Sequence, residues 1–268
     1  VDAAREAILD FLDKCDIMHT RIIHIDGKPF QRIVRDYDYN YIPVLKFESY
    51  EKYCEWARED AKIPINIDGC LYRIFLIDIN GKIGLYSVTH HIISDATSFA
   101  HIGKYVTRYL KGERDIIIYP YYEYIQSEKE YETSNRYNKD KLFWLEESQK
   151  IESNYYCDKT IESKRSNRLC FTLNKDICHK IKIFSDTYDV TEYAFLFSVL
   201  AIKYFKTTQK KDFFIGTPVL NRYGIREENM LGVFVNTVPV GFRIQSEDTL
   251  FSLCDILIFV KEIRTATG

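Results

Sequence analysis

The first hydrophobic pattern along the chain is helical. Ala4, Ile8, Phe11, Leu12 and Cys15 follow one another at helical spacing, which places them on one face of an amphipathic helix. Because the pattern is already present at the first residues, the sequence is expected to start inside or at the edge of that helix. The same periodicity predicts further helices in the first half of the chain, at 49–60, from 99 to near 112, at 119–132 and at 138–149.

Two turns that contain glycine predict hairpins between these helices. Asp26-Gly27 separates apolar segments at 21–25 and 30–34, and Asn80-Gly81 separates segments at 71–78 and 83–91. A two-residue hairpin turn requires positive φ, which Gly, Asn and Asp adopt at low cost. We therefore expect two antiparallel strand pairs, with the last strand running as far as residue 91.

A polar segment at 153–167 divides the chain. It carries charges and serines without hydrophobic alternation, as expected of a linker. Beyond it, the pattern predicts strands at 168–173, 212–216 and 233–243 and helices at 175–187, at 191–207 and from 249. Helices and strands in both halves indicate an α/β (α+β) fold class, with an N-terminal lobe at 1–152 and the first part of a C-terminal lobe at 168–268.

Composition limits the possible partners and environment. The chain has 268 residues, 46% of them hydrophobic, which suffices for one large core or two modest ones. Its 37 basic and 39 acidic residues are scattered and leave a net charge of −2, so nucleic acid is not an expected partner. Without an apolar run of about 18 residues or a signal-peptide core, we expect a cytoplasmic protein. The seven cysteines lack C-x-x-C spacing and are expected to be reduced, mostly structural thiols.

The most informative group of polar residues is HHIISDA at 90–96. Neighbouring side chains on a strand point to opposite faces, so we expect only one histidine of the pair to serve a site. His90 would share its face with apolar residues of the strand, whereas His91 would lie where strand gives way to loop, a common place for reactive groups. His91 is therefore the candidate catalytic residue, and His90 the candidate structural one.

Other chemistries find little support in the sequence. Zinc sites need about three or four ligands, and no cysteine or further histidine lies at ligand spacing, the next histidine being His101, so no metal is expected. No G-x-S-x-G elbow supports a serine hydrolase, and no G-x-x-x-x-G-K loop supports ATP use. Cys15 is expected to be a packing thiol rather than a nucleophile.

Three motifs in order resemble those of condensation domains of nonribosomal peptide synthetases, in the superfamily of chloramphenicol acetyltransferase. HHIISDA at 90–96 is similar to H-H-x-x-x-D-G, with Ala96 in place of glycine. IGTPVLNR at 215–222 and LGVFVNTVP at 231–239 resemble I-G-T-P-V-x-x-R and G-x-F-V-N-T. KCDIMHTR at 14–21 is a weaker match to R-H-E-x-L-R-T that loses both arginines, and YYEY at 121–124 is similar to Y-x-D-F or Y-x-D-Y.

The resemblance implies a function and a set of site residues. It implies that the domain forms an amide bond between a donor acyl thioester and the amine of an acceptor aminoacyl thioester. His91, His90 and Asp95 are then the catalytic candidates, His91 acting either as general base or as a positioning group for the amine. Asp95 is expected to organise the loop by pairing with a basic residue, either Lys14 or Arg222.

Four further residues are expected at the substrate. The backbone N–H of Ala96 could face the oxyanion, although alanine would adopt a glycine-like positive φ only at a cost. Asn236 could hydrogen-bond substrate or brace the junction of the lobes, and Gly216 and Thr237 complete the candidate substrate-binding set.

The resemblance also implies an architecture and partners. The expected fold is a chloramphenicol acetyltransferase-like two-lobe sandwich with a nearly complete N-terminal lobe and a partial C-terminal lobe. The chain would then be truncated at both ends, and this fragment alone would be poorly active. Expected partners are upstream and downstream peptidyl carrier domains, which present 4′-phosphopantetheine arms, and an adjacent adenylation domain. The domain itself is expected to bind no cofactor and to be monomeric.

The sequence leaves two other function classes open. One is a stand-alone acyltransferase of the same superfamily that uses coenzyme A, and the other is an inactive condensation-like docking module. Epimerization domains share the histidine motif but usually write the G-x-F-V-N-T stretch differently, and cyclization domains usually replace the histidine pair with two aspartates. Both are therefore disfavoured.

Overall fold

The computed structural model describes residues 1–35, 42–149, 169–222 and 224–255. It separates into two compact units, one formed by 1–133 with 220–235 and the other by 134–219 with 236–268. The units are thus not contiguous in sequence, unlike the predicted lobes at 1–152 and 168–268, because the segment at 220–235 belongs with the N-terminal residues. The predicted linker at 153–167 lies outside the described residues, and the lobe boundaries stay a prediction.

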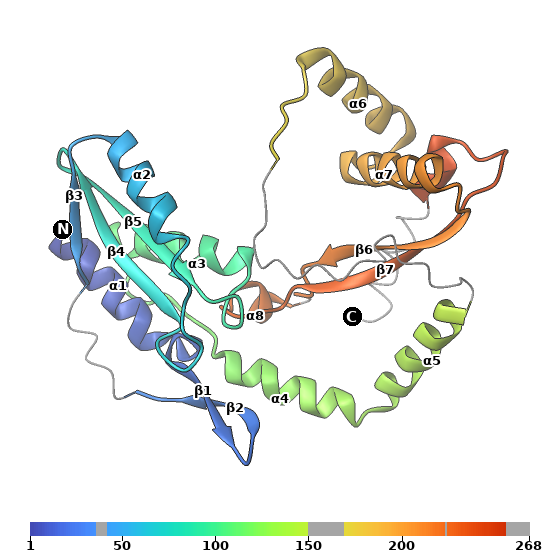
Figure 1. Cartoon of the computed structure of the whole chain (residues 1–268). Helices are drawn as coiled ribbons and strands as arrows, with labels where there is room; N and C mark the ends of the chain where they lie inside the picture. Colours follow the sequence, from blue (N-terminus) through green and yellow to red (C-terminus); the bar gives the residue numbers. More distant parts are fainter. Residues whose placement is uncertain (36–41, 150–168, 223, 256–268) are drawn as a thin grey trace. The chain divides into compact units, whose positions relative to one another are not determined.

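The first unit contains most of the strands (Figure 1). Its helices are α1 (Asp2–Lys14), the 3-10 helix η1 (Asp16–His19), α2 (Tyr50–Asp60), α3 (Ala96–Leu110), α4 (Tyr121–Glu132) and α8 (Ile225–Glu228). Its strands are β1 (Thr20–Ile25), β2 (Lys28–Ile33), β3 (Val44–Phe47), β4 (Tyr72–Ile79) and β5 (Lys82–Thr89). They form an antiparallel β1–β2 hairpin and a sheet of order β3-β4-β5, in which β3 is parallel and β5 antiparallel to β4.

Both predicted hairpins are confirmed, and the turn residues explain their register. Asp26 and Gly27 have φ of 52° and 75°, and Asn80 and Gly81 have φ of 51° and 81°. Positive φ at both central positions matches the twist of the flanking strands. The pairs Ile25↔Lys28 and Ile79↔Lys82 therefore close each hairpin with a two-residue loop.

Alternation along β4 places a helix layer on each face of the sheet. Ile74 and Leu76 are buried in the core that includes Phe11 of α1, whereas Phe75 on the opposite face packs edge-on against Trp56 of α2. Figure 1 shows α2 on one side of the sheet and α1 and α3 on the other. Phe11 meets Tyr105 of α3 at a ring separation of 5.4 Å. This sandwich holds the start of α3, where the candidate site lies, against a packed core.

The second unit is built from α5 (Asn135–Gln149), α6 (Lys175–Tyr188), α7 (Glu192–Thr208), β6 (Asp212–Val219) and β7 (Asn236–Arg243). Strands β6 and β7 pair antiparallel along their whole length. Asn174 and Thr191 accept hydrogen bonds at the N-termini of α6 and α7. Phe213 and Phe242 stack at 5.5 Å in a core that also contains Phe197 of α7.

Three sequence expectations about elements were wrong. The strand expected at 168–173 is absent from its described part, 169–173, which leaves Leu169 and Phe171 exposed with no neighbouring strand paired to them. The last strand of the sheet ends at Thr89 rather than 91, and β7 begins at Asn236 rather than 233. The short elements β3, η1 and α8 were not predicted because four-residue segments carry too little periodicity.

The final expected helix is described only in part: residues 250–255 are helical, and the remainder lies outside the described residues.

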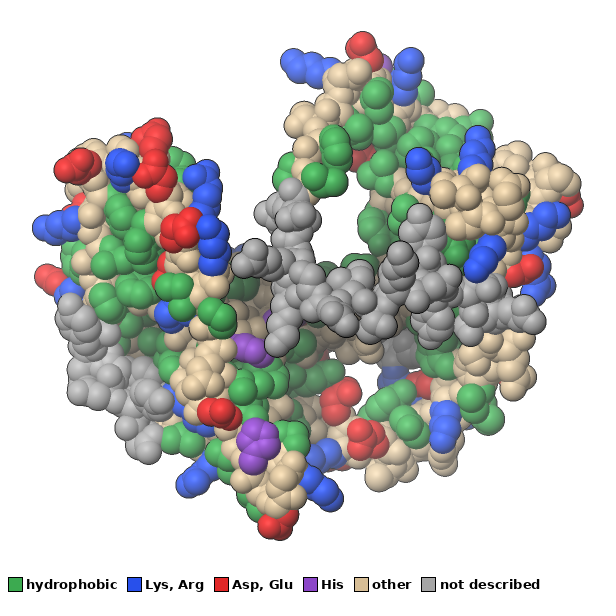
Figure 2. Space-filling model, in the orientation of Figure 1, with side chains coloured by type: hydrophobic (Ala, Val, Ile, Leu, Met, Phe, Trp, Pro, Cys, Tyr) green, Lys and Arg blue, Asp and Glu red, His purple; other side chains and the backbone are tan. Residues whose placement is uncertain are grey.

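The surface carries mixed charge. Figure 2 shows basic and acidic side chains interspersed on the visible face of each unit, in keeping with the scattered charges of the sequence. Within the part of the chain that the structure describes, no helix combines the length and the apolar character needed to cross a bilayer.

Candidate functional site

The histidine pair lies in a turn that follows β5. Because β5 ends at Thr89, the predicted strand alternation does not reach His90 and His91. His91 is exposed, while His90 is partly buried, so the core position that the strand pattern predicts for His90 is wrong. The turn is closed by the Ile93 N–H, which donates to the His90 carbonyl at 3.1 Å.

The ring of His90 has a local partner. Its Nδ1 accepts a hydrogen bond from the Ile92 N–H at 3.1 Å, and its own backbone N–H donates to the Leu71 carbonyl at 2.8 Å. A neutral His90 therefore carries its proton on Nε2. These bonds fix the backbone on which His91 is displayed.

Asp95 connects the histidine turn to helix α3. It is the N-cap residue, and its side chain accepts from the Ser98 N–H at 3.0 Å. The Asp95 N–H in turn donates to Ser98 Oγ, which completes a capping box. Its second oxygen accepts from the Phe234 N–H at 3.1 Å. At 4% exposure the carboxylate is buried, and these donors compensate for its lost hydration.

Arg222 is the basic partner of Asp95. Its Nη2 lies 3.0 and 3.1 Å from the two carboxylate oxygens of Asp95, and both side chains are 3% exposed. Lys14, the other partner that the sequence left open, instead contacts Asp10 at 3.0 Å and the Tyr105 hydroxyl at 3.1 Å. Lys14 therefore ties α1 to α3 and does not contact Asp95.

The guanidinium of Arg222 is held by more than the ion pair. Its Nη1 donates to the carbonyls of Glu227 and Met230, the latter at 2.7 Å, and its Cζ lies 3.9 Å from the centre of the Phe234 ring. Cation–π contact and hydrogen bonds to carbonyls both offset the cost of burying the charge. The segment at 220–235 is thereby fixed to the start of α3.

Ser98 and Gly232 form a second link, which the sequence reasoning missed. Ser98 Oγ donates to the Gly232 carbonyl at 2.9 Å and accepts from the Gly232 N–H at 3.1 Å, and Ser98 is fully buried. The signal was present, because Asp95 and Ser98 have the three-residue spacing of a capping box. Gly232 lies inside the motif at 231–239, but its partner could not be read from the sequence.

Gly232→Ala is expected to lower the free energy of unfolding by about 2–4 kcal/mol. Gly232 has φ of 151°, and an added Cβ would lie 2.2 Å from two ring carbons of Tyr121. Urea denaturation followed by circular dichroism measures the change. Gly103→Ala is the matched control, since nothing lies within 4 Å of a Cβ at that helical position. A Gly232→Ala variant as stable as the control would contradict this prediction.

Asp16, which is far from α4 in the sequence, holds the N-terminus of α4 in place. Its two carboxylate oxygens accept from the backbone N–H groups of Tyr121 and Tyr122, each at 2.9 Å. The N-cap residue of α4, Pro120, makes no side-chain cap, so Asp16 satisfies N–H groups that lack partners within the helix. The acidic position of the weak motif at 14–21 is therefore structural.

The pKa of Asp95 lies below its ordinary value of 3.8. Burial acts in the opposite direction, but the Phe234 and Ser98 N–H groups and the charge of Arg222 outweigh it. A carboxyl whose folded pKa is depressed stabilises the fold above its unfolded pKa, and this contribution disappears as pH falls through the folded pKa.

Acid titration should reveal this contribution. We expect the free energy of unfolding to fall as pH drops below about 4, and the fall to be smaller in Asp95→Asn. Asp212→Asn is the control, because its pair with Arg243 is exposed and contributes little. Urea midpoints measured between neutral pH and pH 3 test this, and equal acid sensitivity of wild type and Asp95→Asn would refute it.

Ala96 needs no glycine-like backbone. It is the first residue of α3, and the positive-φ residues of the described chain do not include it. The expected conformational cost of alanine at this position therefore does not arise. Its N–H belongs to the first turn of α3, where backbone donors lack intrahelical acceptors.

The remaining predicted residues lie in the second unit. Asn236 begins β7, is exposed, and its Oδ1 accepts from the Thr237 N–H at 2.8 Å. Gly216 lies on β6, where an added Cβ would be 2.9 Å from the Thr237 methyl group. The glycine thus permits close pairing with β7, and neither role expected for Asn236 is tested by these contacts.

The described cysteines and the possible metal ligands do not form a second reactive site. Cys15 is buried in the core of the first unit, and burial raises the pKa of its thiol, which disfavours the nucleophilic thiolate. Cys15, Cys54, Cys70, Cys170, Cys178 and Cys254 are free thiols, and Cys157 lies outside the described residues. Over the described ranges, no group of three or more His, Cys, Asp or Glu residues is arranged to hold a metal ion.

Comparison with known proteins agrees with the fold and the motifs. A family model described as Condensation domain matches residues 1–263. The chain therefore belongs to the condensation domain family.

Two curated relatives come from Bacillus subtilis (strain 168). The chain is 26% identical over 257 residues to subunit 1 of surfactin synthase and 27% identical over 255 residues to one of the plipastatin synthase subunits, in each case across 89% of this chain. These alignments cover 7% and 10% of the two relatives. The chain thus spans a small part of the curated relatives it matches.

Solved structures share the fold at low identity. SgcC5 from Streptomyces globisporus matches with a TM-score of 0.81 and 16% identity, covering 100% of this chain and 64% of that one. The first condensation domain of the CDA synthetase matches with a TM-score of 0.77 and 16% identity, covering 99% and 66%. The chloramphenicol acetyltransferase-like fold that the family resemblance implies is confirmed.

Proposed function

We propose that this chain catalyses amide bond formation between two acyl units held on carrier proteins. The observation that carries the proposal is the family match over residues 1–263, combined with an exposed His91 on a turn anchored by the buried Asp95–Arg222 pair. Its relatives are named as synthase subunits of which it matches only a small part. We assign it the condensation step of a nonribosomal peptide synthetase.

In the proposed reaction, an amine on one carrier arm attacks the thioester carbon of an acyl group on the other. The C–N bond forms, the C–S bond breaks, and the proton lost from nitrogen ends on the departing thiolate. Holding both ends together converts an encounter into an effectively unimolecular step, which can supply about 7–11 kcal/mol of the barrier. Catalysis then depends on the rigidity of the turn at 90–95.

His91 is the residue assigned to the attacking amine. It either accepts the amine proton or hydrogen-bonds the nitrogen into place. Asp95 acts through the fold, since its oxygens are occupied by Arg222, Ser98 and Phe234. The Ala96 N–H, at the positive end of α3, is the proposed donor to the oxyanion.

The substrates and partners follow from this assignment. Donor and acceptor arrive on the 4′-phosphopantetheine arms of peptidyl carrier domains, and an adenylation domain supplies the activated acceptor. Gly216, Asn236 and Thr237 are also assigned to substrate binding. We place the protein in the cytoplasm, in keeping with free thiols at six described cysteines.

The test follows product formation on the full-length gene product that contains this chain. Donor and acceptor carriers are loaded with acyl and aminoacyl groups, and intact mass spectrometry detects the carrier-bound amide. Amide on the acceptor carrier supports the proposal. Product formed only from free acyl-coenzyme A identifies a coenzyme A-dependent acyltransferase, and carrier binding without product identifies a docking module; either result overturns it.

A further inference from the structure

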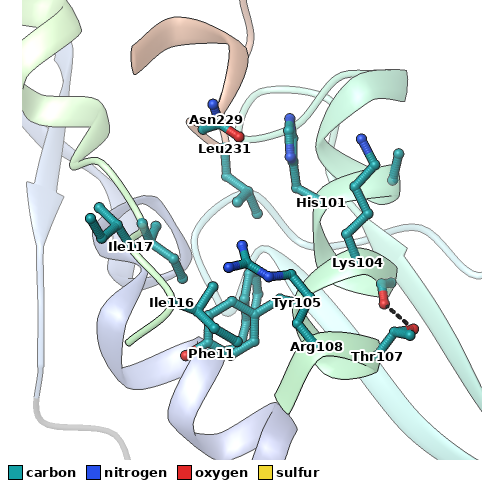
Figure 3. Close-up of a pocket in the computed structure, with 13 residues that line it drawn as sticks. Phe11, His101, Lys104, Tyr105, Thr107, Arg108, Ile116, Ile117, Asn229 and Leu231 are labelled. Carbon is teal, nitrogen blue, oxygen red and sulfur yellow. Dashed lines mark hydrogen bonds between the residues drawn. The ribbon is translucent and has the colours of Figure 1, made fainter. Parts of the chain in front are cut away.

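The first unit contains a cavity that none of the predicted site residues lines. Its volume is about 520 Å³. Figure 3 shows it between one face of α3, the segment at 116–118, and Asn229 with Leu231. Because His91, Asp95 and Arg222 are not among its lining residues, the cavity is separate from the candidate catalytic turn.

The floor of the cavity is apolar. Phe11, Tyr105, Ile116 and Leu231 line it, and all four are buried. Exposed Ile117 extends the apolar wall outward. Small-molecule sites typically enclose about 300–1,000 Å³ and bury most of their ligand against such side chains. The floor therefore suits an alkyl or aryl body.

The polar side of the cavity carries two cations and one histidine. His101, Lys104 and Arg108 follow at helical spacing on α3 and all line it, whereas no Asp or Glu does. Figure 3 shows the Arg108 guanidinium directed into the cavity, with Lys104 on the same helix face. No ion pair is found for Lys104 among the described residues. The cavity lining thus carries positive charge and contains no carboxylate that would neutralise it.

Glu113, which does not line the cavity, forms an ion pair with Arg108. The Arg108 Nε donates to Glu113 Oε2 at 2.7 Å, and both side chains are about half exposed. The Nη groups of Arg108 remain as donors of the kind that bind carboxylates. Glu113 would therefore compete with a bound anion for the Arg108 guanidinium.

His101 adds an unsatisfied polar atom. Its Nε2 is buried and has no hydrogen-bond partner in the described chain. Burial, followed by the charges of Arg222 and Lys104, lowers the pKa of His101, although the charge of Asp95 and a hydrogen bond to the Glu228 backbone act in the opposite direction, so the neutral ring is favoured. A neutral imidazole with a free nitrogen can hydrogen-bond a polar ligand atom, whereas buried polar groups without partners are rare.

We propose that this cavity binds a small amphipathic monocarboxylate, separately from the amide-forming reaction. The apolar body lies against Phe11, Ile116 and Leu231, and the carboxylate lies between Lys104 and Arg108. The chemical class follows from the apolar floor, the cationic edge and the volume taken together.

Isothermal titration calorimetry with octanoate tests the proposal on this chain. Saturable one-to-one binding is expected, weakened at least about fivefold by Lys104→Gln and, in wild type, by the replacement of octanoate with octan-1-ol. Lys82→Gln, which removes the same charge from exposed β5, should bind as wild type. Equal loss in both lysine variants, or equal affinity for the alcohol, would overturn the proposal.

Two further variants separate the cavity from general surface binding. Gly103→Leu should fold, because nothing lies within 4 Å of a Cβ there and leucine favours the helix, yet it should fill the cavity and abolish binding. Glu113→Gln should tighten binding about two- to threefold by releasing Arg108. Since unfolding cannot raise affinity, an unchanged Glu113→Gln variant, or a Gly103→Leu variant that binds as wild type, would contradict the site.

Discussion

Replacing His91 with alanine is expected to reduce the rate of amide formation by about 10²–10⁴-fold, the usual contribution of a positioned acid–base group. The side chain is exposed on the turn after β5, so its removal should leave the fold unchanged. Single-turnover formation of the carrier-bound amide measures the rate. His24→Ala, at an exposed histidine of β1, is the control and should keep the wild-type rate.

His91→Gln distinguishes the two roles left open for this residue. Glutamine retains a hydrogen-bond acceptor but is not a base at neutral pH. A rate close to wild type would mean that His91 positions the amine, and a rate close to that of His91→Ala would mean that it accepts the proton. If His91→Ala itself reacts at the wild-type rate, the assignment of His91 is wrong.

Asp95→Ala is expected to lower the free energy of unfolding by about 3–5 kcal/mol, the cost of leaving a buried partner charge uncompensated. The change leaves the Arg222 guanidinium without its carboxylate partner and removes the acceptor for the Phe234 and Ser98 N–H groups. Urea denaturation at neutral pH measures it. The Asp95→Ala/Arg222→Ala double variant should lose less than the sum of the single variants, because each single change leaves the other partner unpaired.

The exposed pair of Asp212 and Arg243 supplies the control. Asp212→Ala removes an ion pair of the same 3.0 Å separation in which the side chains are 46% and 58% exposed. Solvent-exposed pairs are worth about 0–1 kcal/mol. A loss for Asp95→Ala no larger than for Asp212→Ala would show that the buried pair does not anchor the histidine turn.

Local pattern predicted most elements because their causes are local. Asp26-Gly27 and Asn80-Gly81 adopt positive φ at low cost, so both hairpins and their registers could be read from the local sequence. The strand expected at 168–173 failed for the opposite reason. Alternation around Leu169 and Phe171 indicates that a strand is possible, but a strand exists only where another strand pairs with it.

The candidate site divides in the same way. The motifs identified the histidine turn, and the resemblance supplied Asp95 and two candidate partners. Only the tertiary structure distinguishes Arg222 from Lys14 as the partner, because the contact with Asp95 joins residues 127 positions apart. The end of β5 also could not be read from the sequence. Beyond Thr89, a turn closed by the His90 carbonyl takes the place of the expected strand.

The sequence by itself determined the longer helices, the two hairpin turns and the family of this protein, all of which depend on interactions within a few residues or on motif order. Only the tertiary structure decided that Arg222 pairs with Asp95, that Ser98 hydrogen-bonds both backbone groups of Gly232, and that α3 borders a cavity lined by Lys104 and Arg108. The physical reason is that burial and charge pairing depend on which distant segments meet, and many segments could meet without altering the local pattern.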